Sequence, residues 1–124
     1  MPALPLLLAF AFGQTQTMYD QTLDCTIAAT ASAEALAERE PALAEQMRRL
    51  ATSGTKLVRD HAGLKGMTPD QATASVDAGA QRYRNAFAKV DDPEKYRNAA
   101  LNLSKKAVAT CKQVTDGWAN YKGQ

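Results

Sequence analysis

The sequence has very little of what metal, haem and nucleophile chemistry requires. Its 124 residues include one histidine and two cysteines. Covalent attachment of a c-type haem needs a C-x-x-C-H motif, and neither Cys25 nor Cys111 begins one. A zinc site needs three or four converging ligands, which one histidine and two distant cysteines do not supply. We therefore expect no metal site and no catalytic residues.

Aromatic residues and excess charge are also scarce. Aromatic side chains make up 6% of the chain, and the formal net charge is +2. A composition that is poor in aromatics and rich in alanine favours closely packed helices over a β-sandwich. The near balance of charge does not suggest a nucleic-acid or anionic-membrane partner, and Lys105, Lys106 and Lys112 have no aromatic residues between them. The chain length is that of one domain.

Long hydrophobic runs are absent except for a short one at the N-terminus. Residues 3–12 are almost entirely apolar, which is too short for a membrane span of about 20 residues. Ala11-Phe12-Gly13 has the small-x-small pattern that a signal peptidase recognises. The sequence predicts a cleaved signal peptide over 1–13 and a mature domain over 14–124. No Lys or Arg precedes the apolar run, so a start codon farther upstream and a buried N-terminal segment are the alternatives.

Export changes the interpretation of the cysteines. In an oxidising compartment two thiols tend to pair, so we expect a periplasmic or secreted protein with a Cys25–Cys111 disulfide and no stable membrane insertion after cleavage. A catalytic cysteine would need a nearby base, and His61 is the only imidazole. Pairing of the cysteines is the stronger hypothesis.

Four amphipathic segments follow the signal peptide. Apolar residues recur at the three-and-four spacing of a helix over 15–38, 41–64, 68–90 and 92–121. Thr68-Pro69-Asp70-Gln71 is a capping box, and Asp92-Pro93 is a typical helix start. Gly66 suits a left-handed helix end. Pro41 begins a new helix, or else it kinks one long helix. Short connections predict an all-α, up-down-up-down antiparallel four-helix bundle.

Charge and cysteine position support this topology. Residues 17–40 sum to −4, whereas residues 41–65 and 92–122 each sum to +3, which favours an acidic first helix between the second and the fourth. Cys25 lies about nine residues after the start of the first helix, and Cys111 lies about nine before the end of the last. Antiparallel neighbours bring both to roughly 13 Å from the same end of the bundle. The sequence predicts one disulfide that joins helices 1 and 4.

His61 is on an apolar stripe rather than on a polar face. It either caps the end of its helix or packs at the open end of the core. The alternative is an axial ligand to a non-covalent haem with Met18, or less favourably Met47, as its partner. Gly54 and Gly79 either leave room for such a flat cofactor or let two helices approach closely. Four-helix b-type cytochromes have a similar outline, although no family motif is present.

The remaining candidates carry weaker signals. The pairs Asp20/Asp24 and Glu34/Glu38 fall on a polar helix face, where solvent exposure explains them better than acid–base catalysis. Four further residues close the core at one end, which is the favoured interpretation, or else line a small pocket there, and they are Tyr19, His61, Trp118 and Tyr121.

The residue pattern predicts binding rather than catalysis. We expect an exported, disulfide-stapled bundle, not an enzyme, that acts by binding. Its role is to bind a partner protein, to protect against stress, or to serve as an inhibitor or immunity-type protein. Leu23 and Ile27 lie outside the stripe of the first helix and are predicted as exposed contact residues. The alternative function is a periplasmic carrier of haem or another small cofactor that uses His61.

Overall fold

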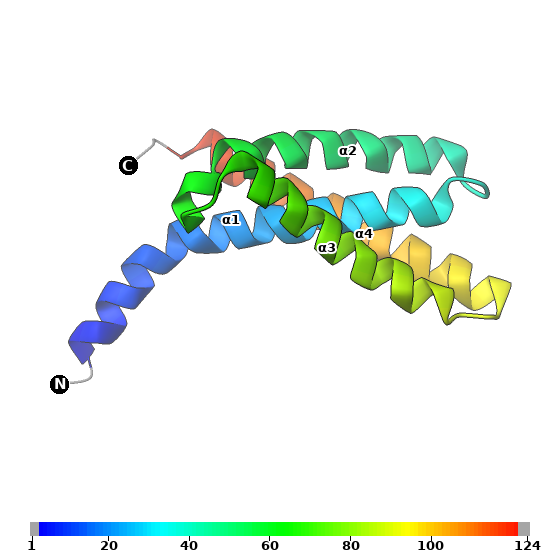
Figure 1. Ribbon diagram of the computed structural model, residues 1–124, viewed down its shortest axis with the longest axis horizontal. Coiled ribbons are helices and arrows are strands. Elements are labelled where there is room, and N and C mark those ends of the chain that lie inside the picture. Colours follow the sequence, from blue (N-terminus) through cyan, green and yellow to red (C-terminus); the bar gives the residue numbers. More distant parts are fainter. Residues whose placement is uncertain (1–2, 122–124) are drawn as a thin grey trace.

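The protein consists of helices and their connections. The computed structural model describes the backbone of residues 3–121 and the side chains of residues 18–121. Four long helices and one short 3-10 helix follow in the order α1 (Ala3–Leu36), α2 (Pro41–Asp60), η1 (Ala62–Lys65), α3 (Pro69–Ala88) and α4 (Pro93–Ala119). Successive long helices run in opposite directions (Figure 1). The described part of the chain contains no strand. The predicted all-α four-helix bundle is confirmed.

The predicted signal peptide is the start of α1. Its backbone is helical from Ala3 onward, and this first part of the helix projects away from the other three helices (Figure 1). Residues 1–2 and the side chains of this segment lie outside the described part, so cleavage after residue 13 stays a prediction.

Local sequence signals set the helix starts as expected. The Thr68 hydroxyl accepts from the Gln71 backbone N–H while the Gln71 side chain accepts from the Thr68 N–H, which completes the capping box. The Asp92 carboxylate accepts from the N–H of Glu94 at the start of α4. Pro41 is the first residue of α2, after a turn over residues 37–40. The kinked single helix is therefore wrong.

The end of α2 comes earlier than the periodicity predicts. The helix stops at Asp60, and His61 is its C-cap residue. Gly66 does adopt the left-handed conformation, with φ of 68°, but it ends η1 rather than α2. The apolar pattern continues through Leu64 and so cannot distinguish an α-helix from a 3-10 turn.

Helix α1 is the central element, because α2 and α4 pack along it and α3 crosses it. Its middle part is buried on nearly every side, and the residues from Cys25 to Ala29 are all buried. Ile27 is only 6% exposed, and Leu23 packs against the same cluster. The prediction that Ile27 is an exposed contact residue is wrong, because α3 covers the face that the stripe of α1 left free.

Two glycines permit this close packing. A Cβ atom on Gly54 of α2 would overlap the hydroxyl of Thr26, and one on Gly79 of α3 would overlap the side chain of Ile27. The Thr26 hydroxyl is itself satisfied, since it donates to the Thr22 carbonyl at 2.7 Å. The helices therefore approach closely at both glycines, as one of the two predictions for them had it.

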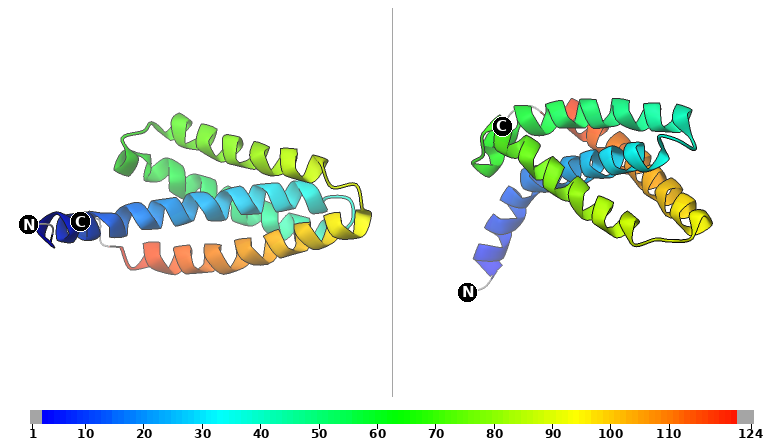
Figure 2. Two further views of the ribbon diagram at one scale, coloured as in Figure 1. Left: turned by 90° about the horizontal axis from the view of Figure 1, so that it is seen from below. Right: turned by 45° about the vertical axis from the view of Figure 1, so that its right-hand side comes forward.

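The fourth side of the bundle is open. Helices α3 and α4 lie on either side of α1 (Figure 2) and make no extensive contact with each other. They touch beside the turn that joins them, where the Phe87 and Tyr96 rings are 5.2 Å apart between centroids. The apolar stripe of the predicted segment 68–90 is not buried along its whole length. Its second half, with Tyr83 and Phe87 on α3 and Val90 just beyond that helix, is only partly buried.

Candidate functional site

The two cysteines form the predicted disulfide between α1 and α4. The Cα atoms of Cys25 and Cys111 are 5.1 Å apart, and both side chains are buried. The bond closes a loop with a sequence separation of 86 residues. Neither thiol is free, so the Cys–His nucleophile considered from the sequence is not formed. The disulfide fixes α4 against the central helix, at the end of the bundle where α4 ends.

Three ring-bearing side chains gather near this disulfide. The His61 and Trp118 rings stack with centroids 3.8 Å apart, and Tyr121 meets both rings edge-on. The Trp118 indole N–H donates to the Thr22 hydroxyl at 2.8 Å. His61 Nδ1 lies 3.0 Å from the Leu57 carbonyl. His61 therefore occupies the helix-capping position that the simpler hypothesis assigns to it.

Tyr19, the fourth residue considered for an end pocket, closes the core instead. It is 1% exposed and packs in a cluster with Val58 and Val76, as the favoured interpretation predicts. Burial, with a smaller contribution from neighbouring Asp20, raises the pKa of Tyr19. Its hydroxyl is buried without a hydrogen-bond partner among the described residues.

The haem hypothesis stays a prediction, although the features that suggested it are now occupied. Trp118 covers one face of the His61 ring, and Met18 packs beside Gly117 of α4. The space expected at Gly54 and Gly79 is filled by side chains of α1. An absorption spectrum of protein made with haem available tests the hypothesis. If no Soret band appears, or if the band is unchanged by His61→Ala, the hypothesis is wrong.

The open side of the bundle forms an apolar groove, which we call the α3–α4 groove. It has a volume of about 370 Å³ and is lined by Tyr83, Ala86, Phe87, Val90, Ala99, Asn102, Leu103 and Lys106. A second hollow of about 290 Å³ continues it and shares Tyr83, Ala86 and Lys106. Ile27 of α1 and Gly79 of α3 line this continuation, together with the charged residues Asp24 and Arg82. Central helix α1 thus contributes to the floor.

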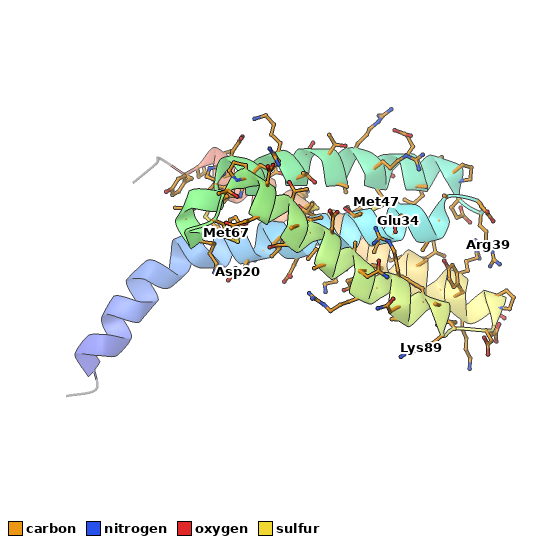
Figure 3. The ribbon with its side chains drawn as sticks, viewed as in Figure 1. Asp20, Glu34, Arg39, Met47, Met67 and Lys89 are labelled. Atoms are coloured by element: carbon orange, nitrogen blue, oxygen red, sulfur yellow. A yellow bond between two sulfur atoms is a disulfide. The ribbon has the colours of Figure 1, made fainter. Side chains whose placement is uncertain are left out.

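An ion pair holds α3, one wall of the groove, in place against α1. The Arg84 guanidinium donates two hydrogen bonds, each of 2.7 Å, to the two carboxylate oxygens of Glu34. This bond to Glu34 raises the pKa of Arg84. Figure 3 shows Glu34 where α3 crosses α1. The pair joins α3 to the central helix directly, so the wall does not depend on contact with α4.

Ion pairs from the acidic first segment reach each of the other three segments. Asp20 pairs with Lys65 at 3.2 Å, Glu34 with Arg84, and Glu40 with Arg97 of α4 at 2.9 Å. These side chains are partly exposed, so each pair adds little stability but favours this arrangement of neighbours. The carboxylates Asp20, Asp24, Glu34 and Glu38 are all exposed, as predicted for a polar face.

A polar hollow of about 380 Å³ lies at the opposite end of the bundle, between the two turns. Arg39 is already engaged there, since it donates to the Pro93 carbonyl at 3.0 Å and lies 5.9 Å from the centroid of the Tyr96 ring. The other charged lining residues of this hollow, Glu34, Glu38 and Asp91, are exposed to solvent. The α3–α4 groove differs from this hollow in its mainly apolar lining.

Sequence reasoning missed this groove. The available signal was the run of basic residues in the two helices beside it. Residues 78–90 and 95–115 contain eight Lys or Arg and no Asp or Glu. Because both helices carry positive charge, they repel one another when they approach closely. Periodicity alone identifies an apolar stripe but not whether another helix covers it.

Comparisons with known proteins found no match. No protein-family model, no curated protein and no solved structure matches it. Within the described residues, no helix combines the length and apolar character that crossing a membrane demands, and no cluster of three or more potential metal ligands is found. The disulfide is compatible with an extracellular or periplasmic protein.

Proposed function

We propose that this chain is an exported, disulfide-stapled helical bundle that acts by binding a partner protein through the α3–α4 groove. The observation that carries the proposal is the groove itself, an apolar concave surface between two helices that hardly touch. Exposed apolar surfaces of this kind are characteristic of interaction sites.

The contacts of the potentially reactive groups support binding over catalysis. Both sulfur atoms are in the disulfide, and the His61 ring is stacked against Trp118 with Nδ1 directed at a backbone carbonyl. The groove is lined instead by apolar side chains, with Asn102 and Lys106 as its polar members. An apolar surface with a few polar groups provides contact area and orientation, which is what recognition requires.

The proposal is tested by photo-crosslinking in the organism that makes the protein. A benzophenone amino acid replaces Ala86 or Ala99, which line the groove, or Ala78, an exposed residue of α3 that does not. We expect a crosslinked product of one defined mass from positions 86 and 99 and none from position 78. Identical products from all three positions, or no product while the purified protein is monomeric and inert, would refute the proposal.

A further inference from the structure

The partner's chemistry can be inferred from the charges around the α3–α4 groove. Of the eight basic residues in the two walls, Arg84 and Arg97 are paired with acids of the first segment. The other six have no ion pair among the described residues, and they are Arg82, Lys89, Lys95, Lys105, Lys106 and Lys112. Figure 3 shows one of these side chains, Lys89, directed away from the bundle at the end of α3. The charged residues that line the two hollows, Arg82 and Lys106 against Asp24, leave one uncompensated positive charge there.

Two of the unpaired cations are part of the groove lining. Lys106 of α4 and Arg82 of α3 line the same hollow from opposite walls, with Asp24 as the only acid there. Closing α3 onto α4 would bring these two cations together and remove them from water, which is unfavourable without a counter-charge. An occupant that carries carboxylates removes this obstacle, whereas a basic occupant adds to it.

The shape of the groove favours a helix over a small molecule. Small-molecule sites enclose most of the ligand surface, but this groove is bounded by two helices that diverge from the turn at residues 89–92 and is open on one side (Figure 2). Gly79 to Ala88 spans about 13 Å along α3, which is the length of two and a half helical turns. Apolar side chains in the i, i+3, i+4, i+7 pattern of a docked helix would contact Tyr83, Phe87 and Leu103.

We infer that the α3–α4 groove binds an acidic amphipathic helix of the partner protein, with the apolar face of that helix in the groove and its carboxylates at Arg82 and Lys106. This inference rests on the proposed function and adds the chemical class of the partner. The groove is then the vacant position of one further helix in the bundle.

The test uses the purified, oxidised protein and designed peptides of about 18 residues, long enough to exceed the groove. One peptide has Leu and Ala on one face and Glu on its flanks, a second has Lys in place of Glu, and a third has the composition of the first in scrambled order. Binding is measured by fluorescence anisotropy. We expect the acidic peptide to bind at least tenfold more tightly than the other two, with an affinity that falls as salt is added.

Matched variants locate the site. Lys106 lines the groove and its neighbour Lys105 does not, so Lys106→Glu and Lys105→Glu change the net charge equally. We expect Lys106→Glu to weaken the acidic peptide about threefold to tenfold and Lys105→Glu to change its affinity less than twofold. Ala86→Glu should weaken it and Ala78→Glu should not. Circular dichroism establishes that each variant is folded.

Each contrary outcome has a defined meaning. Equal or tighter binding of the basic peptide, or equal effects of both lysine variants, overturns the acidic helix but leaves the proposed function intact if photo-crosslinking at residues 86 and 99 still captures one partner. Binding to vesicles of anionic phospholipid without binding of any peptide overturns it in favour of a membrane surface. No peptide binding and no crosslink overturn both proposals together.

Discussion

Helix α4 has two sides that differ sharply. On one side it packs along α1 through small buried residues such as Ala107 and is joined to it by the Cys25–Cys111 disulfide. On the other side it faces α3 across an apolar groove with unpaired cations in its lining. Small side chains and opposite charges let two helices close together, whereas like charges and exposed aromatics leave a position open. The closed side provides stability and the open side provides a surface.

The sharpest way to test this contrast is to place the same carboxylate on both sides. Ala107 is fully buried on the closed side, whereas Ala86 is exposed at the groove. Ala107→Glu buries an unpaired charge and should lower the free energy of unfolding by 4 kcal/mol or more, on the order of the largest single-residue effects. Ala86→Glu should change it by less than about 0.5 kcal/mol. Urea denaturation measures both, and similar losses would mean that the groove is closed in solution.

Removing the disulfide is the next largest perturbation. The Cys25→Ala/Cys111→Ala double variant opens the loop and should lose about 3 to 5 kcal/mol of stability by the chain-entropy account. The matched control is the wild type with reductant, which should show a comparable loss. Intact mass with and without reductant establishes the thiol state. An unchanged denaturation midpoint in both would show that packing alone holds the closed side.

Gly79 links the core to the groove wall. A methyl group there meets Ile27 and must displace it, so Gly79→Ala should cost about 1 to 3 kcal/mol in thermal denaturation. Gly63→Ala is the control, since nothing lies within 4 Å of a Cβ at that position. Adding Ile27→Val to Gly79→Ala should recover part of the loss. A harmless Gly79→Ala would mean that α3 is not fixed against α1.

Trp118 ties the chain terminus to the closed side. Trp118→Phe keeps a ring against His61 but removes the hydrogen bond to Thr22, so it should lose about 1 kcal/mol. His61→Ala measures the stack separately. Thr22→Val should lower the stability by a similar amount. If the double variant loses no more stability than either single variant, the effect is due to the hydrogen bond between Trp118 and Thr22.

The smallest effect is expected at Tyr19. Because its hydroxyl is buried without a partner, Tyr19→Phe should leave stability at neutral pH within about 1 kcal/mol, or raise it slightly. Its pKa is raised in the folded state, so the unfolded chain ionises first and stability falls above about pH 10. Tyr19→Phe should reduce that fall. A stability curve in alkali that is the same for both proteins would contradict this.

Residues that act locally could be predicted from the sequence. Thr68, Asp92 and Pro41 start helices through contacts within one turn, and the heights of the two cysteines follow from helix rise. The burial of Ile27 and the openness at Phe87 could not, because each depends on which distant helix lies opposite. An amphipathic stripe predicts that one face of a helix is buried, but it does not predict which element buries it. The stacking of His61 on Trp118 is likewise decided by packing across the end of the bundle.

The position of the disulfide also determines how the molecule bears load. A pulling force applied to the two chain ends passes from Cys25 directly to Cys111 through a covalent bond. The segment between them, residues 26–110, includes α2, α3 and the groove and is then outside the line of tension. A protein pulled at both ends would keep the α3–α4 groove undistorted while only the outer turns of α1 and α4 are stretched.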